Sequence, residues 1–158
     1  YCAGFLCTFV ESEGGLTGMD VPAIQQLIEH LPPAPHRLTV AGGVATTEEA
    51  ARLIALGLDV QVGMALYTGK LDPAEVLLQT VAFDRSAYQD PALIPTVVQD
   101  EAGDVLMLAY SSPESLREAL TTGTGVYYSR SRNAMWHKGH TSGHTQQLMK
   151  VRLDCDRD

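Results

Sequence analysis

The sequence predicts two structural parts of different class: a parallel α/β part over residues 1–83 and an α+β part over residues 96–158. In the first part, short apolar runs alternate with helical runs, which is the pattern of a parallel sheet with crossover helices. In the second part, two strand-like runs joined by a short turn precede one helix. The polar segment 84–95 contains Pro91 and Pro95 and is predicted to be a linker.

In the first part we expect strands within residues 5–10, 37–44 and 59–66, each followed by a helix. Asp20 is a predicted N-cap with proline in the first turn behind it. The spacings Thr46–Glu49 and Asp72–Glu75 are those of capping boxes. The pair Pro32–Pro33 is expected to separate the first helix from the second strand.

In the second part the turn at residues 100–103 joins two predicted strands into a hairpin. Ser111 and Glu114, on either side of Pro113, are expected to start a helix that Gly123 ends. A strand over residues 125–131 then delivers two arginines to a loop that contains Trp136. A last strand is predicted from Gln146 onward.

In that last strand, side chains alternate between faces. Met149, Val151, Leu153 and Cys155 would share an apolar face, and Asp154, Asp156 and Asp158 would end the polar one. Three neighbouring carboxylates favour a hard cation such as Mg²⁺, whereas a thiolate on the opposite face suits Zn²⁺. Spacing alone leaves open, and favours, an acidic solvated strand end with one buried cysteine.

Composition limits the function further. The net charge of −8 argues against a nucleic-acid binder. Acidic residues strongly outnumber basic ones in residues 1–90, but the two are nearly balanced afterwards, so the second part can offer positive charge to a phosphorylated ligand. No signal peptide or membrane span is evident, and three cysteines without framework spacing suit a reducing compartment. A cytoplasmic protein is expected.

From about Leu93 onward the chain resembles phosphoribosyl-AMP cyclohydrolase, an enzyme of histidine biosynthesis. The resemblance rests on the run 129–132, on Trp136, on Lys138–Gly139, on the run 141–143, on Gln146 and on the run 154–158. It implies hydrolytic opening of the adenine ring of phosphoribosyl-AMP at the N1–C6 bond, in a homodimer whose zinc site is shared between subunits. A zinc-bound water would be the nucleophile.

The same resemblance implies roles for individual residues. Asp154, Asp156 and Asp158 would bind Mg²⁺, and Cys155 would be one zinc ligand. Two further zinc cysteines and a histidine lie downstream of this motif in the family, so the catalytic residues are expected beyond Asp158. The expected substrate-binding residues are Ser129, Arg130, Arg132, Trp136, Lys138, Gly139, Thr141, Ser142 and Gly143.

Some of these residues have simpler interpretations. Lys138, Thr141, Ser142 and nearby backbone N–H groups could bind phosphate or could belong to a solvated loop. Trp136 could stack on a purine or serve packing alone. For His137, His140 and His144 a supporting or solvated role is expected rather than metal binding, because the glycines among them indicate a loop.

Residues 1–83 resemble the C-terminal part of phosphoribosylformimino-5-aminoimidazole carboxamide ribotide isomerase. The resemblance implies strands six to eight of a (β/α)₈ barrel, with Thr8 in the active site and Gly42, Gly43 and Gly63 at phosphate loops. From spacing alone, tight turns explain these glycines equally well. The aspartates on which isomerase catalysis depends belong to earlier strands, so isomerase activity is not expected from these residues.

Both ends are interpreted as cut, within a longer fusion of consecutive histidine-biosynthesis enzymes. This polypeptide alone is therefore expected to be nearly inactive. The alternatives are a ribotide isomerase whose missing aspartates come from another chain, and a phosphoribosyl-binding fragment without turnover.

Overall fold

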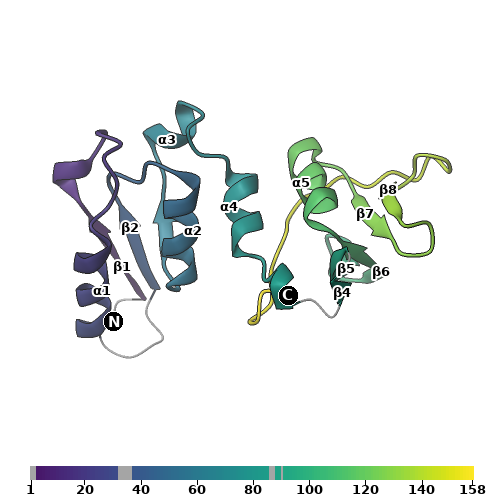
Figure 1. Ribbon diagram of the computed structural model, residues 1–158, viewed down its shortest axis with the longest axis horizontal. Helices are drawn as coiled ribbons and strands as arrows, with labels where there is room; N and C mark the ends of the chain where they lie inside the picture. The colour runs from purple at the N-terminus through teal and green to yellow at the C-terminus, as the bar shows by residue number, and fades with distance from the viewer. Residues whose placement is uncertain (1–2, 32–36, 86–87, 90) are drawn as a thin grey trace. The chain divides into compact units, whose positions relative to one another are not determined.

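The computed structural model describes residues 3–31, 37–85, 88–89 and 91–158. Cys2 and the pair Pro32–Pro33 lie outside the described residues. The chain divides into two compact units, Tyr1–Thr80 and Val81–Asp158, and most of their elements are labelled in Figure 1. Among the described residues, no helix has the length and apolar character needed to cross a bilayer.

The first unit contains a three-stranded parallel sheet in the order β1-β2-β3, which confirms the predicted parallel α/β class. Register pairs Thr8 with Ala41 and Ala41 with Gln61, so the carboxyl ends of the three strands lie side by side. Its elements are β1 Gly4–Thr8, η1 Val10–Ser12, α1 Val21–His30, β2 Arg37–Ala41, α2 Thr47–Ala55, β3 Asp59–Gln61, α3 Met64–Tyr67 and α4 Pro73–Thr80.

The third strand is shorter than predicted, because residues 64–67 form α3 rather than continuing β3. The core is centred on Ile24 of α1, Val40 of β2 and Leu53 of α2, all of which are fully buried. These side chains come from one face of each helix and from the central strand. The alternation of apolar and helical runs in the sequence therefore corresponds to helices that pack onto this sheet.

Helix starts in this unit follow local chemistry, with one difference. Asp20 accepts a hydrogen bond from the Ala23 N–H at 3.0 Å, and Thr46 accepts one from the Glu49 N–H at 3.2 Å. The Glu49 carboxylate does not complete a capping box; it accepts from the backbone N–H groups of Met19 and Ala45 instead. It therefore fastens the loop before α1 to the start of α2.

The second unit is α+β. An antiparallel sheet has the order β4-β5-β6, and β7 and β8 form a separate antiparallel pair. The predicted hairpin is confirmed: Asp100 Oδ1 accepts from the N–H groups of Ala102 and Asp104, each at 2.9 Å. The elements are η2 Phe83–Arg85, β4 Tyr88–Gln89, β5 Ala92–Gln99, β6 Val105–Ser111, α5 Pro113–Thr122, β7 Val126–Ser129 and β8 Ala134–His137.

Two boundaries in this unit correct the sequence predictions. Residues 92–95, which the sequence places in a linker, belong to β5, and residues 88–89 form β4. Ser111 ends β6, where its hydroxyl is 2.7 Å from that of Thr96, and Ser112 is the N-cap of α5 in a capping box with Ser115. Gly123 ends α5 in the left-handed region at φ +67°, as predicted.

The predicted strand from Gln146 onward is wrong. Residues 148–158 contain no strand, and Gln147 makes an isolated bridge to Thr124. The end of the chain turns instead: Asp154 Oδ1 accepts from the N–H groups of Asp156 at 3.1 Å and Arg157 at 2.7 Å. Local carboxylate-to-backbone bonds of this kind compete with extended structure, so the expected alternation of faces does not hold there.

Candidate functional site

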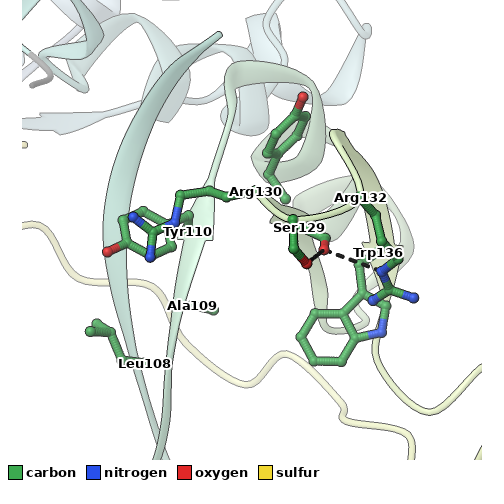
Figure 2. A pocket seen from close by; sticks show the side chains of 9 residues that line it. Leu108, Ala109, Tyr110, Ser129, Arg130, Arg132 and Trp136 are labelled. Carbon is green, nitrogen blue, oxygen red and sulfur yellow. Dashed lines mark hydrogen bonds between the residues drawn. The ribbon is translucent and has the colours of Figure 1, made fainter. Parts of the chain in front are cut away.

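An open pocket of about 530 Å³ lies in the second unit, against β6, β7, β8 and the turn between the last two strands (Figure 2). Four of the predicted substrate-binding residues line it: Ser129, Arg130, Arg132 and Trp136. Leu108, Ala109, Tyr110, Tyr128 and Ser131 complete the wall. The structure thus brings the two arginines, which lie close in sequence to Tyr128 and Trp136, together with Tyr110, about twenty positions earlier in the chain.

The turn over residues 130–133 presents both arginines. It connects Ser129 to Ala134, which are paired in the β7–β8 register. Asn133 takes a left-handed backbone conformation at φ +49°, which asparagine tolerates better than most residues. The Tyr128 hydroxyl donates to Asn133 Oδ1 at 2.7 Å and so ties the turn to the preceding strand.

Arg130 is held by two tyrosines. Its Cζ lies 3.7 Å from the ring centroid of Tyr110 and 5.3 Å from that of Tyr88, and Nη1 donates to the Tyr88 hydroxyl at 2.7 Å. The two rings meet edge to face, with centroids 5.5 Å apart. A hydrogen bond with Tyr88 is the main cause that raises the pKa of Tyr110, and desolvation adds to it.

Arg132 and Lys138 both lie near the ring of Trp136. Arg132 Cζ is 5.6 Å and Lys138 Nζ is 5.3 Å from the ring centroid, within the range of cation–π attraction. Arg132 Nε also donates to the Ser129 hydroxyl at 3.2 Å (Figure 2). Trp136 is not in a loop, as the sequence predicts, but in β8, where it pairs with Tyr127.

The loop after β8 is closed by tight backbone contacts. The Lys138 N–H donates to the Gly125 carbonyl, and the Gly125 N–H donates to the Gln146 carbonyl, both at 2.9 Å. A Cβ on Gly139 would lie 2.3 Å from backbone atoms of His144 and Thr145, and φ there is +83°. Gly139 therefore serves packing within the loop, because no side chain fits at that position.

The remaining predicted phosphate donors do not reach the pocket. Thr141, Ser142 and Gly143 are exposed in the loop and are not among the pocket-lining residues. The Ser142 hydroxyl accepts from the His144 N–H at 3.4 Å. These residues form a solvated turn, so the charged groups at the pocket come from the arginines.

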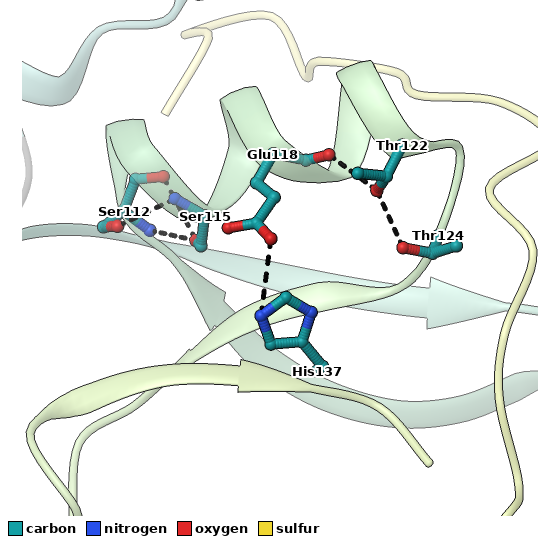
Figure 3. Close-up of polar contacts among 6 residues, drawn as sticks. All are labelled: Ser112, Ser115, Glu118, Thr122, Thr124 and His137. Atoms are coloured by element: carbon teal, nitrogen blue, oxygen red, sulfur yellow. Dashed lines mark hydrogen bonds and ion pairs between the residues drawn. The ribbon is translucent and has the colours of Figure 1, made fainter. Parts of the chain in front are cut away.

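Helix α5 supports the same hairpin from behind (Figure 3). Glu118 Oε1 lies 3.4 Å from His137 Nε2, which links α5 to β8. The buried Ser112–Ser115 capping box fixes the start of that helix. The predicted supporting role fits His137, and His140 and His144 are exposed in the loop.

The residues expected to bind metal do not gather. Within residues 3–31, 37–85, 88–89 and 91–158, no three His, Cys, Asp or Glu side chains form a group that could hold a metal ion. Asp154, Asp156 and Asp158 are exposed, and the Asp154 carboxylate is engaged with its own backbone. Cys155 is an exposed free thiol rather than buried on an apolar face.

In the first unit, Thr8 and the glycines after β2 lie at the carboxyl ends of neighbouring strands. However, a Cβ on Gly42 would lie 2.5 Å from the Phe9 carbonyl oxygen, and one on Gly43 would lie 2.6 Å from Ser12 Cβ. The chain itself fills the space beside both glycines. Gly63 precedes α3, and nothing lies within 4 Å of a Cβ added to it.

Sequence reasoning missed the tyrosines of the pocket. The sequence places Tyr88 in the predicted linker and Tyr110 in the predicted hairpin strand that follows the turn at residues 100–103. Alternation along β6 offers a signal, since Leu108 and Tyr110 share one face of that strand. The contact between Arg130 and Tyr88, 42 positions apart, leaves no local signal.

A pocket that combines arginines with aromatic rings on an α+β unit is typical of proteins that bind phosphorylated, ring-containing small molecules. Comparison with known proteins agrees with this class. Residues 107–158 match the family model described as phosphoribosyl-AMP cyclohydrolase. Residues 1–72 match the model described as histidine biosynthesis protein.

Individual relatives named phosphoribosyl-AMP cyclohydrolase extend the match. The one from Haloarcula marismortui is 56% identical over 79 residues, which cover 49% of this chain and 62% of that protein. The one from Salinibacter ruber is 54% identical over 76 residues, covering 48% and 60%. The one from Corynebacterium jeikeium is 47% identical over 88 residues, covering 55% and 69%.

The chain belongs to the phosphoribosyl-AMP cyclohydrolase family. It spans about three fifths of the length of the first relatives that it matches. The matched part includes the turn with both arginines and the strand with Trp136.

Proposed function

We propose that the second unit belongs to an enzyme that opens the adenine ring of phosphoribosyl-AMP by hydrolysis at the N1–C6 bond, a step of histidine biosynthesis. The observation that carries the proposal is the convergence of Ser129, Arg130, Arg132 and Trp136 on one open pocket. A guanidinium group binds phosphate through paired N–H donors. The substrate carries two phosphate groups, and the pocket offers two arginines.

Trp136 lies beside these cations and can contact the base of the same ligand. Its ring attracts Arg132 and Lys138, so the three side chains can act as one surface that combines charge with an aromatic face. In this unit the residues bind and orient the substrate. Zinc would supply the activated water for ring opening when it is bound.

The metal assignments stay predictions of the resemblance. They are Mg²⁺ at Asp154, Asp156 and Asp158, and Zn²⁺ at Cys155. Zinc normally takes three or four protein ligands, and residues 91–158 hold one cysteine. We therefore expect this polypeptide to bind zinc weakly.

A homodimer is part of the same proposal. Val97 and Leu108 are directly paired in the β5–β6 register, so they share one face of the sheet, and they are 59% and 61% exposed. Exposed apolar faces of this kind often mark interaction surfaces. Leu106, two positions before Leu108 in β6, lies on the same face and is 55% exposed. The double substitution Val97→Glu with Leu106→Glu is expected to lower the sedimenting mass to that of a monomer, and an unchanged mass would contradict the proposed homodimer.

For the first unit we propose the last strands of a (β/α)₈ barrel. The parallel order β1-β2-β3 with a helix after each strand supports this proposal. Ribotide isomerase activity is not proposed for this chain.

The test uses residues 1–158 with phosphoribosyl-AMP. Ring opening is followed by ultraviolet absorbance, binding by calorimetry, and metal content by atomic spectroscopy, each before and after adding Zn²⁺ and Mg²⁺. We expect saturable binding that Arg132→Gln weakens, and turnover that depends on the zinc retained. The proposal is wrong if the folded protein neither binds nor converts this nucleotide.

A further inference from the structure

Three side chains from distant segments form a stack at the edge of the pocket. Tyr88 lies in β4, Tyr110 in β6, and Arg130 in the turn after β7. The guanidinium carbon is 3.7 Å from the Tyr110 centroid, which is close contact, and Nη1 reaches the Tyr88 hydroxyl at 2.7 Å. One face of the guanidinium is therefore covered, and one of its N–H groups is already bonded.

An arginine side chain in solution samples many conformations, and holding it in place costs conformational entropy on binding. The ring of Tyr110 restricts the guanidinium plane, and the hydroxyl of Tyr88 restricts its rotation within that plane. The N–H groups that do not face Tyr88 keep the capacity to bind a planar or tetrahedral anion.

We propose that Tyr88 and Tyr110 are positioning residues for Arg130, which they hold at the pocket edge to bind one phosphate of the nucleotide. This inference rests on the proposed function for the identity of the ligand. Tyr88 is of particular interest, because it lies outside the part of the chain that matches the cyclohydrolase family model. Its role is to complete the site from β4.

The geometry assigns separate tasks to the two tyrosines. Tyr110 contributes its ring, so Tyr110→Phe keeps the platform and Tyr110→Leu removes it. Tyr88 contributes its hydroxyl as a hydrogen-bond acceptor, so Tyr88→Phe removes the bond and keeps the edge-to-face contact with Tyr110. We expect Tyr110→Leu to weaken nucleotide binding about fivefold and Tyr88→Phe about threefold, since cation–π contacts and single hydrogen bonds are of this size.

The deciding experiment is a double-mutant cycle measured by calorimetric titration of residues 1–158 with phosphoribosyl-AMP and separately with AMP, in the presence of a chelator so that no turnover occurs. If Tyr110 acts through Arg130, Tyr110→Leu lowers affinity in the native background and has no further effect beside Arg130→Ala. A loss of equal size in both backgrounds would mean that Tyr110 supports the fold alone, and would overturn the proposal.

Two controls complete the test. Tyr110→Phe keeps the ring and removes the hydroxyl that bonds to Tyr88; its affinity should stay within twofold of that of the native protein, and a larger loss would mean that the hydroxyl of Tyr110 is needed as well. Tyr67→Phe, at an 84% exposed position in the first unit, should change neither affinity nor melting temperature.

The two proposals fail in different ways. If Arg132→Gln weakens binding but the cycle on Arg130 shows no coupling, the positioning proposal falls and the proposed function stands. If AMP binding shows the coupling while phosphoribosyl-AMP is not preferred, the positioning proposal stands and the substrate assignment falls. Absence of binding by both nucleotides would overturn both.

Discussion

The two units each contain an open pocket, and the two pockets differ in the charge of the side chains that line them. The pocket in the first unit has a volume of about 470 Å³ and is lined by Glu48, Glu49 and Arg52 among other residues. The pocket in the second unit is lined by Arg130 and Arg132 and by no carboxylate. The second pocket alone has the charge to attract a phosphorylated ligand.

Glycines explain little of this difference. Gly42 and Gly43 allow the loop after β2 to pack against the segment from Phe9 to Gly18, and Gly139 allows its loop to pack against His144. In both units the glycine serves contact between backbone segments. The difference in charge between the pockets comes from Arg130 and Arg132, which contact the rings of Tyr110 and Trp136.

The largest expected effect tests the packing role of Gly139. A Cβ there would be 2.3 Å from His144, and the left-handed φ adds strain, so Gly139→Ala should lower the free energy of unfolding of the second unit by about 3 kcal/mol. Urea unfolding monitored by the fluorescence of Trp136, the one tryptophan of the chain, measures this.

Gly143→Ala is the matched control for that substitution. It has a similar φ of +77° in the same loop but open space around the Cβ, so we expect a loss of about 1 kcal/mol. Equal losses at the two positions would mean that backbone conformation, and not the contact with His144, determines the need for glycine.

The next effect concerns the charge difference between the pockets. The double substitution of Arg130 and Arg132 by Gln should weaken phosphoribosyl-AMP binding about thirtyfold, roughly 2 kcal/mol, because two charge-assisted phosphate contacts are lost. Arg52→Gln, in the pocket of the first unit, should leave the affinity unchanged. Calorimetric titration at low and high salt measures both; an effect of Arg52→Gln as large as that of the double substitution would remove the distinction.

A smaller effect tests whether Gly42 has the same packing role in the first unit. Gly42→Ala places a Cβ 2.5 Å from the Phe9 carbonyl oxygen, whereas Gly57→Ala, also at positive φ, meets nothing within 4 Å. We expect Gly42→Ala to destabilise the first unit by about 1.5 kcal/mol more than Gly57→Ala does. Hydrogen exchange in β2 measures the difference, and similar exchange in both variants would argue that the loop after β2 has room to move.

Local rules predicted much of the fold. Asp20 and Gly123 were placed correctly at helix ends, and the hairpin at Asp100 was placed correctly, because each depends on bonds between residues a few positions apart. Arg130 and Arg132 were also predicted as binding residues, because the sequence run 129–132 resembles that of a known family. That sequence run does not predict that the two arginines line one pocket with Tyr110 and Trp136.

The presence or absence of strand pairing accounts for the errors. Trp136 lies in a strand because the turn at 130–133 sets a register that pairs it with Tyr127. The alternation after Gln146 does not form a strand, because Asp154 bonds to its own backbone and Gln147 makes a single bridge. Period-two spacing over a few residues is not sufficient when no neighbouring strand pairs with the segment.

The smallest effect concerns Tyr127, which is 8% exposed and packs against Trp136, with ring centroids 6.0 Å apart. Its hydroxyl donates to Gln146 Oε1 at 2.8 Å. Burial raises the pKa of Tyr127. The folded state therefore keeps the proton where the unfolded chain, with a pKa near 10, releases it. This contribution to stability is fully present below pH 10 and is lost as pH rises from there through the raised pKa.

Tyr127→Phe should cost about 1 kcal/mol of unfolding free energy at pH 7, because the hydrogen bond to Gln146 is lost. It should also make the loss of stability above pH 10 less steep than in the native protein. Urea unfolding between pH 7 and 11, with Tyr67→Phe as the exposed control, tests both expectations. If the stability of Tyr127→Phe and that of the native protein fall in parallel above pH 10, Tyr127 does not titrate differently in the folded and unfolded states. The contact between Tyr127 and Trp136 would then be more open to water than its packing indicates.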